Sequence, residues 1–195
     1  PYILGNTYHN LRKLQPAHGG KDEGAVSDDG KLEEKEYNLA VVKEIARLLE
    51  QSGVKVYCTR TTDRTVSKKA RVRLANKRQA DMLVSVHCNA SDARKHSVRG
   101  IEVLYSKRDN GAGYTNKQLA AKLLKKTVAA TGLPARGVIR REDLYLMHHA
   151  KVPAVIVETG YLTNPSDCLY MRQEKGIRQT AWGIYQAVME TLEKY

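Results

Sequence analysis

Three polar side chains stand where apolar segments of the sequence end. His18 follows "LQPA" and precedes two glycines, His87 follows "MLVSV", and Glu158 follows "PAVIV". Imidazole and carboxylate groups can bind a metal or transfer protons. Glycine beside His18 lets the backbone bend sharply, which suits a loop that aims a ring at a partner. Each residue alone also has an ordinary interpretation: His18 could lie in a surface turn, and Glu158 could cap a helix or pair with an arginine.

Carboxylates also gather in "GKLEEKEYNL", residues 30–39, where Glu33, Glu34 and Glu36 lie close to the start of a predicted helix. Acidic residues in a first helical turn are favoured by the helix dipole alone, and we expect that explanation to hold for two of the three. Two histidines with one carboxylate and a further glutamate fit a catalytic zinc site. Such a site takes three protein ligands and keeps a fourth position for water.

The segments that must position these residues alternate between strands and helices. Apolar residues recur at helical spacing in "EYNLAVVKEIARLLEQS", whereas "VKVYCTR" alternates and is rich in strand-forming residues. Ser67 suits a helix N-cap, and Gly132 suits a helix end. The predicted helices cover residues 36–52, 67–80, 115–131 and 177–194, with a short helix or turn at 144–150. The predicted strands cover residues 54–60, 81–90, 100–106 and 152–160, after a first strand that ends before His18.

This alternation predicts a single α/β domain with a mostly parallel central sheet flanked by helices. We place the domain at residues 13–195 and expect residues 1–12 to be an arm or the remainder of a larger chain. Ligands of open α/β sheets bind beyond the carboxyl ends of the strands. His18, His87 and Glu158 all end strands, so we expect them to meet at that edge.

The chain is strongly basic. It has 33 lysines and arginines against 21 aspartates and glutamates, a formal net charge of +12 over 195 residues. Such a balance favours polyanionic partners, either nucleic acid or an anionic cell surface or wall. Single-stranded nucleic acid is usually bound with stacking aromatic residues, but the chain has no Phe and one Trp. The composition therefore leans toward an anionic wall polymer, with no nucleic-acid partner.

Cysteine usage and hydropathy narrow the class of protein further. The three cysteines Cys58, Cys88 and Cys168 are far apart and odd in number, which argues against a disulfide framework. Cys58 and Cys88 lie in apolar runs and are expected to be buried thiols. No stretch approaches the roughly 20 apolar residues of a membrane span. No signal segment is visible, and the sequence begins with Pro1.

The order of several motifs resembles that of a known family. The motifs "HGGKDEGA", "LEEKEYNL", "SVHCNA" and "PAVIVETGYLTNPSD" resemble the four signature blocks of zinc-dependent N-acetylmuramoyl-L-alanine amidases of the amidase-3 family. "KARVRLAN" and "RGIEVLYS" resemble the family's helix after the second strand and its strand after the second histidine. The resemblance covers about residues 13–195. It implies a central, mostly parallel sheet of about six strands.

Carried over position by position, the resemblance assigns His18, Glu34 and His87 as ligands of one zinc ion. Glu34 is chosen because it precedes "KEYNL", where the family has a glutamate, a lysine, an acidic residue, any residue and Asn-Leu. Glu158 matches the catalytic glutamate. A general base there needs a raised pKa, which burial at the end of an apolar strand can supply.

The chain departs from the family pattern at three positions. Ala17 replaces a glycine, Cys88 replaces a small alanine and Tyr161 replaces a phenylalanine, and none of these changes removes a catalytic group. Neighbours on a strand point to opposite faces, so we expect Cys88 to face away from the metal. Adjacent His148 and His149 diverge by about 100° in a helix and cannot both face the metal.

The resemblance implies hydrolysis of the amide between N-acetylmuramic acid and L-alanine of the stem peptide. The alternative is a zinc peptidase that cuts within the stem peptide; a silent wall-binding module would lack a ligand or Glu158, and a nucleic-acid binder would carry a recognition motif. Charge and position suggest Arg136, Arg140 and Arg141 as contacts for stem-peptide carboxylates. Peptidoglycan is the expected partner, and the cell wall outside the cell is the expected location.

Overall fold

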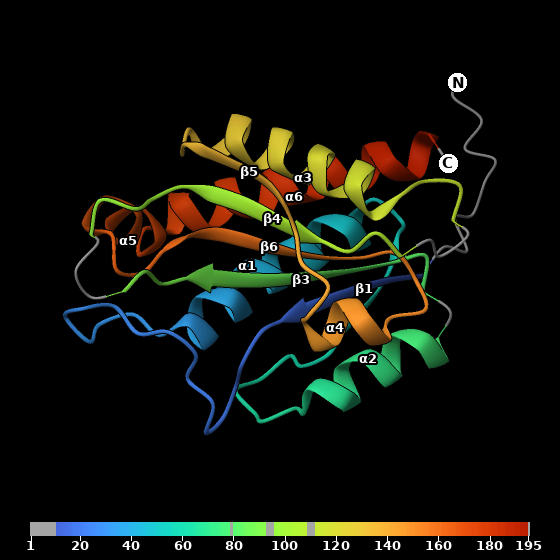
Figure 1. The fold of residues 1–195 in the computed structure, drawn as a ribbon, viewed down its shortest axis with the longest axis horizontal. Coiled ribbons are helices and arrows are strands. Elements are labelled where there is room, and N and C mark those ends of the chain that lie inside the picture. Colours follow the sequence, from blue (N-terminus) through green and yellow to red (C-terminus); the bar gives the residue numbers. More distant parts are fainter. Residues whose placement is uncertain (1–10, 79, 93–95, 109–111, 195) are drawn as a thin grey trace.

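Six strands form one sheet in the computed structural model, which describes residues 11–78, 80–92, 96–108 and 112–194 (Figure 1). The strands are β1 (Leu11–Pro16), β2 (Lys55–Cys58), β3 (Met82–Asn89), β4 (Ile101–Tyr105), β5 (Ala135–Arg140) and β6 (Ala154–Tyr161). The helices are α1 (Glu34–Gln51), α2 (Lys68–Lys77), α3 (Asn116–Thr131), α4 (Tyr145–His149), α5 (Pro165–Met171) and α6 (Glu174–Lys194). The sheet order is β2-β1-β3-β6-β4-β5.

The predicted α/β class and the mostly parallel sheet are confirmed. Every neighbouring pair of strands is parallel except β4 and β6, which are antiparallel. β1 begins at Leu11, so two residues of the expected arm 1–12 belong to the sheet. The rest of that segment, residues 1–10, lies outside the described residues.

Two elements were not predicted from the sequence, and one helix is longer than expected. β5 is an edge strand whose side chains are exposed or half-buried, so it lacks the apolar alternation that marks a strand. α5 has 7 residues, too few for a periodic pattern to stand out. α6 begins at Glu174, whereas the periodicity placed its start at Ile177.

The caps predicted at Ser67 and Gly132 are confirmed by their hydrogen bonds, although α2 ends at Lys77, before the predicted end at residue 80. The Ser67 side chain accepts from the backbone N–H of Ala70 at the start of α2. α3 opens with a capping box between Thr115 and Gln118 and ends at Gly132, whose φ of 73° is left-handed. These caps fix the limits of two helices that cover opposite faces of the sheet.

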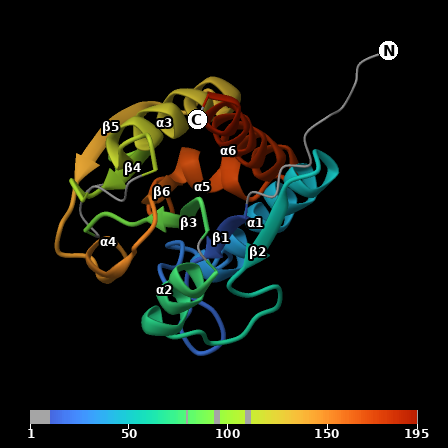
Figure 2. The same ribbon diagram turned by 90° about the vertical axis from the view of Figure 1, so that its right-hand side faces the viewer.

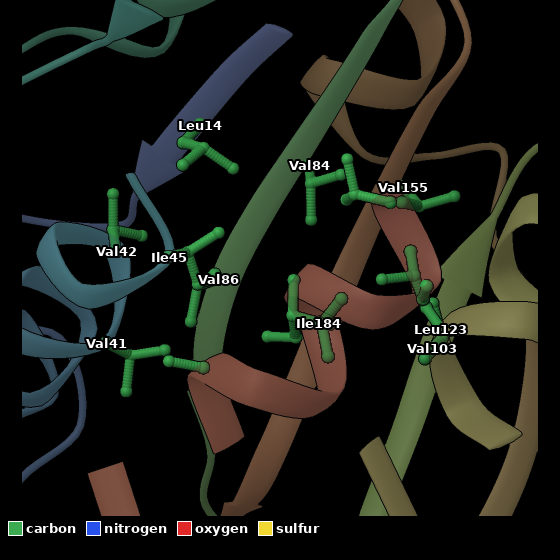
Figure 3. Close-up of a cluster of buried hydrophobic side chains, with 14 of the residues drawn as sticks. Leu14, Val41, Val42, Ile45, Val84, Val86, Val103, Leu123, Val155 and Ile184 are labelled. Atoms are coloured by element: carbon green, nitrogen blue, oxygen red, sulfur yellow. The ribbon is translucent and has the colours of Figure 1, made fainter. Parts of the chain in front are cut away.

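The larger core fills the space between one face of the sheet and α1, α3 and α6 (Figures 1 and 2). Alternate strand residues such as Leu14, Val84 and Val155 point toward these helices, and Figure 3 shows them packed around Ile45 and Ile184. Alternation sends the intervening residues to the other face. This arrangement makes the α1 side of the sheet mostly apolar, with a few buried polar residues such as Asn38 and Thr159.

The other face, covered by α2 and α4, has a mixed character (Figure 2). Its apolar cluster is smaller and includes Val72, Leu83 and Leu146. The buried polar residues Lys13, Gln15 and Ser85 also belong to the sheet, and in the register of β1 and β3 they occupy the positions between the core residues. We call this side, with the side chains of Lys13, Gln15, Ser85, His87, Ile156 and Glu158, the polar face.

Lys13 of the polar face is unfavourable for stability, because it buries an amine without a partner among the described residues. Its side chain is fully buried, and its Nζ has no hydrogen-bond partner among the described residues. Burial, together with the charge of Arg78, lowers the pKa of Lys13 to about 7, although Cys58 acts to raise it. Contrary to expectation, Cys58 is only half-buried, whereas Cys88 is buried as predicted.

Replacing Lys13 with methionine should stabilise the protein at neutral pH. The unfolded chain holds this proton up to about pH 10.5, whereas the folded chain releases it near 7, so the penalty is full below pH 7 and fades as pH rises to 10.5. At about 1.4 kcal/mol per pKa unit, Lys13→Met should gain on the order of 2 to 4 kcal/mol at pH 7. Urea unfolding at pH 7 and pH 10 measures this gain. Exposed Lys77→Met is the control, and an equal gain for Lys13→Met at both values would contradict the interpretation.

Candidate metal centre

The loop after β1 brings His18 to the carboxyl edge of the sheet. His18 adopts a φ of 55°, a left-handed conformation that is uncommon outside glycine. Two buried arginines hold this backbone. Arg71 donates to the carbonyls of Pro16 and His18, each at 2.5 Å, and Arg60 donates to the carbonyl of Ala17 at 2.9 Å. The strained conformation is therefore fixed from two sides.

Asp22 and Gly24 fix the ring of His18. Nδ1 of His18 lies 2.7 Å from Oδ1 of Asp22, a contact that directs Nε2 toward Glu34. A carboxylate on the far ring nitrogen is the usual support of a metal-binding histidine. Gly24 has a φ of 73°, and a Cβ there would lie 2.6 Å from Oε2 of Glu34 and 2.8 Å from the His18 ring. The site therefore requires glycine at this position.

Glu34 is the first residue of α1, and several donors hold its carboxylate. Oε2 accepts from the backbone N–H of Ala25 at 2.9 Å, and Oε1 accepts from the backbone N–H of Cys88 at 3.1 Å. One helical turn later, the side-chain amide of Asn38 donates to Oε1 at 3.2 Å. These bonds fix both oxygens of a residue that is 3% exposed.

Each oxygen of Glu34 faces one histidine. Oε2 is 3.3 Å from Nε2 of His18, and Oε1 is 3.1 Å from Nδ1 of His87. Burial acts to raise the pKa of Glu34, but hydrogen bonds with the two histidines hold it well below its usual range. The carboxylate is therefore ionised at neutral pH, the state that a metal ligand needs.

His18, Glu34 and His87 offer three ligand atoms that lie within 4.8 Å of one another. Two imidazoles and one carboxylate at such spacing fit a zinc ion with an open fourth position. The three residues predicted as ligands are thus brought together. Cys88 points away, as expected, because its Sγ contacts Asn38 and Thr159 on the apolar side of the sheet.

Glu158 lies beside His87 in the sheet, and the two are register partners in β3 and β6. Its Oε2 is buried and has no hydrogen-bond partner among the described residues. Burial raises the pKa of Glu158 to about 7; the charge of His87 opposes this rise, and those of Glu34 and Glu102 add to it. The raised pKa expected for a general base is present.

A polar cluster on the other side of Glu158 was not predicted. Glu102 of β4 is the register partner of Glu158, and its carboxylate accepts from Asn89 at 2.9 Å and from Arg136 at 3.2 Å. The Arg136 guanidinium also lies 5.2 Å from the Tyr161 ring centre. The motif "RGIEVLYS" contained Glu102. However, Glu102 becomes a neighbour of Glu158 only through the antiparallel pairing of β4 with β6.

The other polar candidates lie at the surface. Arg140 pairs with Glu142 and Arg141 with Asp143, both at 2.8 Å. His148 and His149 of α4 are exposed. Neither histidine belongs to the metal-binding group, in agreement with the expectation from their adjacency.

Residues 13–190 match the model of a family described as N-acetylmuramoyl-L-alanine amidase. The chain belongs to this amidase family. LytC of Bacillus subtilis, an N-acetylmuramoyl-L-alanine amidase, is 35% identical over 160 residues, which are 82% of this chain and 31% of LytC. A Staphylococcus aureus protein named "Probable cell wall amidase LytH" is 34% identical over 184 residues, 93% of this chain and 57% of that protein.

A solved structure of this amidase family confirms the fold. The N-acetylmuramoyl-L-alanine amidase of Clostridium difficile 630 is 33% identical, with a TM-score of 0.87 over 94% of this chain and 97% of that chain. The present chain spans about a third of the length of LytC. Among the described residues, no helix combines the length and apolar character needed to cross a membrane.

Zinc affinity should fall by more than about 100-fold in His18→Ala, Glu34→Ala and His87→Ala, because each change removes one of three ligands. Asp22→Asn, which weakens the support of one ligand, should cost roughly 10- to 100-fold. Equilibrium dialysis with metal analysis of the purified protein measures both effects.

Exposed His148→Ala is the matched control and should bind zinc like the unaltered protein. Retention of stoichiometric zinc in all three alanine variants would refute the assignment of the ligands.

Proposed function

We propose that this chain is a zinc-dependent hydrolase that cleaves the amide bond between N-acetylmuramic acid and L-alanine of the peptidoglycan stem peptide. One zinc ion is held by His18, Glu34 and His87, and Glu158 transfers protons. The observation that carries this proposal is the placement of the three ligand groups within 4.8 Å of one another, with the half-buried Glu158 as the register partner of His87. Membership of the amidase family supports the choice of bond.

The chemistry of the site suits amide hydrolysis. A bound zinc ion supplies a Lewis acid that polarises a carbonyl and lowers the pKa of water to about 7. The chain supplies the rigidity, since both oxygens of Glu34 are fixed by backbone donors and His18 is held by Asp22. A site whose ligands are held before substrate binds loses little free energy to reorganisation.

Glu158 performs the proton transfers in this proposal. Its carboxylate takes a proton from the attacking water and delivers it to the departing amine nitrogen of L-alanine. A pKa near 7 suits both steps, because the group can accept a proton and release it again at neutral pH. The unpartnered Oε2 leaves an oxygen free for this exchange.

The arginines Arg136, Arg140 and Arg141 are proposed to contact carboxylates of the stem peptide. Arg136 is exposed and belongs to the cluster that adjoins Glu158 through Glu102, which supports its role most directly. Arg140 and Arg141 already pair with acidic neighbours two residues away. They must exchange these partners to meet a substrate.

The wall outside the cell is the proposed place of action, with anionic wall polymers as further partners. α2 presents Lys69, Arg73 and Lys77 to solvent and carries no acidic residue. A helix of this charge attracts polyanions over distances of about one Debye length.

Glu158→Gln should keep zinc and fold but lose turnover. The amide retains size and polarity and removes the basicity, so the rate should fall by roughly 100- to 10,000-fold. Release of muramoyl-linked peptides from purified peptidoglycan, followed by mass spectrometry, measures the rate and identifies the bond. Cleavage within the stem peptide would show a peptidase instead of an amidase.

Zinc content measured in parallel distinguishes a catalytic role from ligation. Near-normal turnover of Glu158→Gln would refute its role in proton transfer. Loss of zinc would make Glu158 a ligand.

Sedimentation with wall sacs should weaken as salt rises, since exposed charges are screened within about 8 Å at physiological ionic strength. The triple variant Lys69→Gln, Arg73→Gln and Lys77→Gln should bind sacs less tightly at low salt. A control that removes three exposed lysines elsewhere, Lys117, Lys125 and Lys175, has the same net charge. Equal weakening by both variants would leave net charge, not the α2 surface, as the cause.

A further inference from the structure

A cavity of about 310 Å³ lies beside the metal centre, between α2, α4 and the polar face of the sheet. His18 and His87 line its side toward the metal. Its walls are mostly apolar and come from the loop before α2, from α2 and α4 with their flanks, and from β6. They are formed by Val66, Val72, Leu144, Leu146 and Ile156.

Gln15 of β1 also lines the cavity and brings an uncharged amide to it. It is a register partner of Ser85, which is in turn a partner of Ile156, so it lies one step below the row of His87 and Glu158 on the polar face. Gln15 is 6% exposed, and its Oε1 has no hydrogen-bond partner among the described residues. A buried acceptor without a partner costs free energy, so a partner is expected when the site is in use.

The charged groups in the lining either form hydrogen bonds with other parts of the protein or lie at the opening of the cavity. Arg71 donates to the carbonyls of Pro16, His18 and Val66. Lys68 is exposed. Asp22, the carboxylate of the lining, contacts Nδ1 of His18, and the hydroxyl residues Thr65 and Ser67 are exposed. Apart from the half-buried Tyr145, the interior combines apolar walls with the amide of Gln15, which suits an uncharged group that has a methyl and an N–H donor.

We infer that this cavity binds the acetamido group of the N-acetylmuramoyl residue, with its N–H donating to Oε1 of Gln15 and its methyl against the apolar walls. This inference rests on the proposed function. The acetamido group is on the sugar carbon next to the one that bears the lactyl ether. The acetamido group is therefore only a few bonds from the lactyl carbonyl. When that carbonyl lies at the metal, the acetamido group lies close to His87.

Other parts of the substrate fit this cavity less well. The methyl of L-alanine and that of the lactyl group contain no donor and would leave Oε1 of Gln15 unpaired. The carboxylates of the stem peptide would lose their hydration against apolar walls. The acetamido group matches both the walls and the acceptor, because its methyl and its N–H belong to one short uncharged group.

The test compares two synthetic muramoyl peptides, one N-acetylated and one with a free amine at the same position. The unaltered enzyme should cleave the acetylated substrate with a kcat/KM at least about tenfold higher, the value of one hydrogen bond with some apolar burial. Gln15→Met should lower kcat/KM about tenfold for the acetylated substrate and leave the value for the free amine nearly unchanged. Exposed Gln173→Met is the control and should change neither.

A merely structural role of Gln15 would lower both rates by the same factor, and that result overturns the inference. If Gln15→Met does not fold, Val66→Phe decides, because Val66 is half-buried at the cavity wall and the larger ring occupies the same space. It should also abolish the preference for the acetylated substrate, and an unchanged preference overturns the inference. A failure of the unaltered enzyme to cleave either substrate would instead refute the proposed function.

Discussion

The site depends on the contacts that the carboxylate of Glu34 makes with its neighbours. It is a single group that contacts the loop after β1 through His18 and Ala25 and the end of β3 through His87 and Cys88. The loop after β1, the start of α1 and the end of the distant strand β3 therefore meet at two oxygen atoms. The backbone donors hold these oxygens whether or not a metal neutralises them, so the site is organised by the fold itself.

The same sheet serves stability on one face and chemistry on the other. The α1 side buries a large apolar cluster, which supplies most of the hydrophobic stabilisation. The polar face includes buried polar atoms of Lys13, Gln15, Ser85 and Glu158 for which the described part of the chain offers no hydrogen-bond partner. Functional sites commonly depart from optimal packing, and the cost is met by the rest of the structure. Strand alternation keeps the two tasks apart, because a residue on one face does not disturb the other.

The meeting of His18, His87 and Glu158 was predictable because each follows an apolar segment, and the carboxyl ends of parallel strands share an edge. Glu34, at the start of α1, was assigned only through the family resemblance. Helical periodicity also predicted α1, a continuous apolar run predicted β6, and Gly132 marked the end of α3. β5 was not predicted because it is an exposed edge strand, and α5 was not predicted because it is a single short helix. The antiparallel place of β4 could not be predicted, since pairing direction depends on tertiary contacts. Glu102 therefore remained unrecognised as a neighbour of Glu158.

Arg60 and Arg71 were likewise missed, because a sequence does not show that an arginine is buried. Their hydrogen bonds go to carbonyl and hydroxyl oxygens, including those of Ala17, Lys35 and His18. Such acceptors do not titrate, whereas the carboxylate of a surface ion pair is lost once it is protonated. The two guanidinium groups stay charged through the acidic range. The hydrogen bonds that these two arginines donate to the backbone around His18 are thus independent of acidity, so acid leaves this part of the loop's support in place.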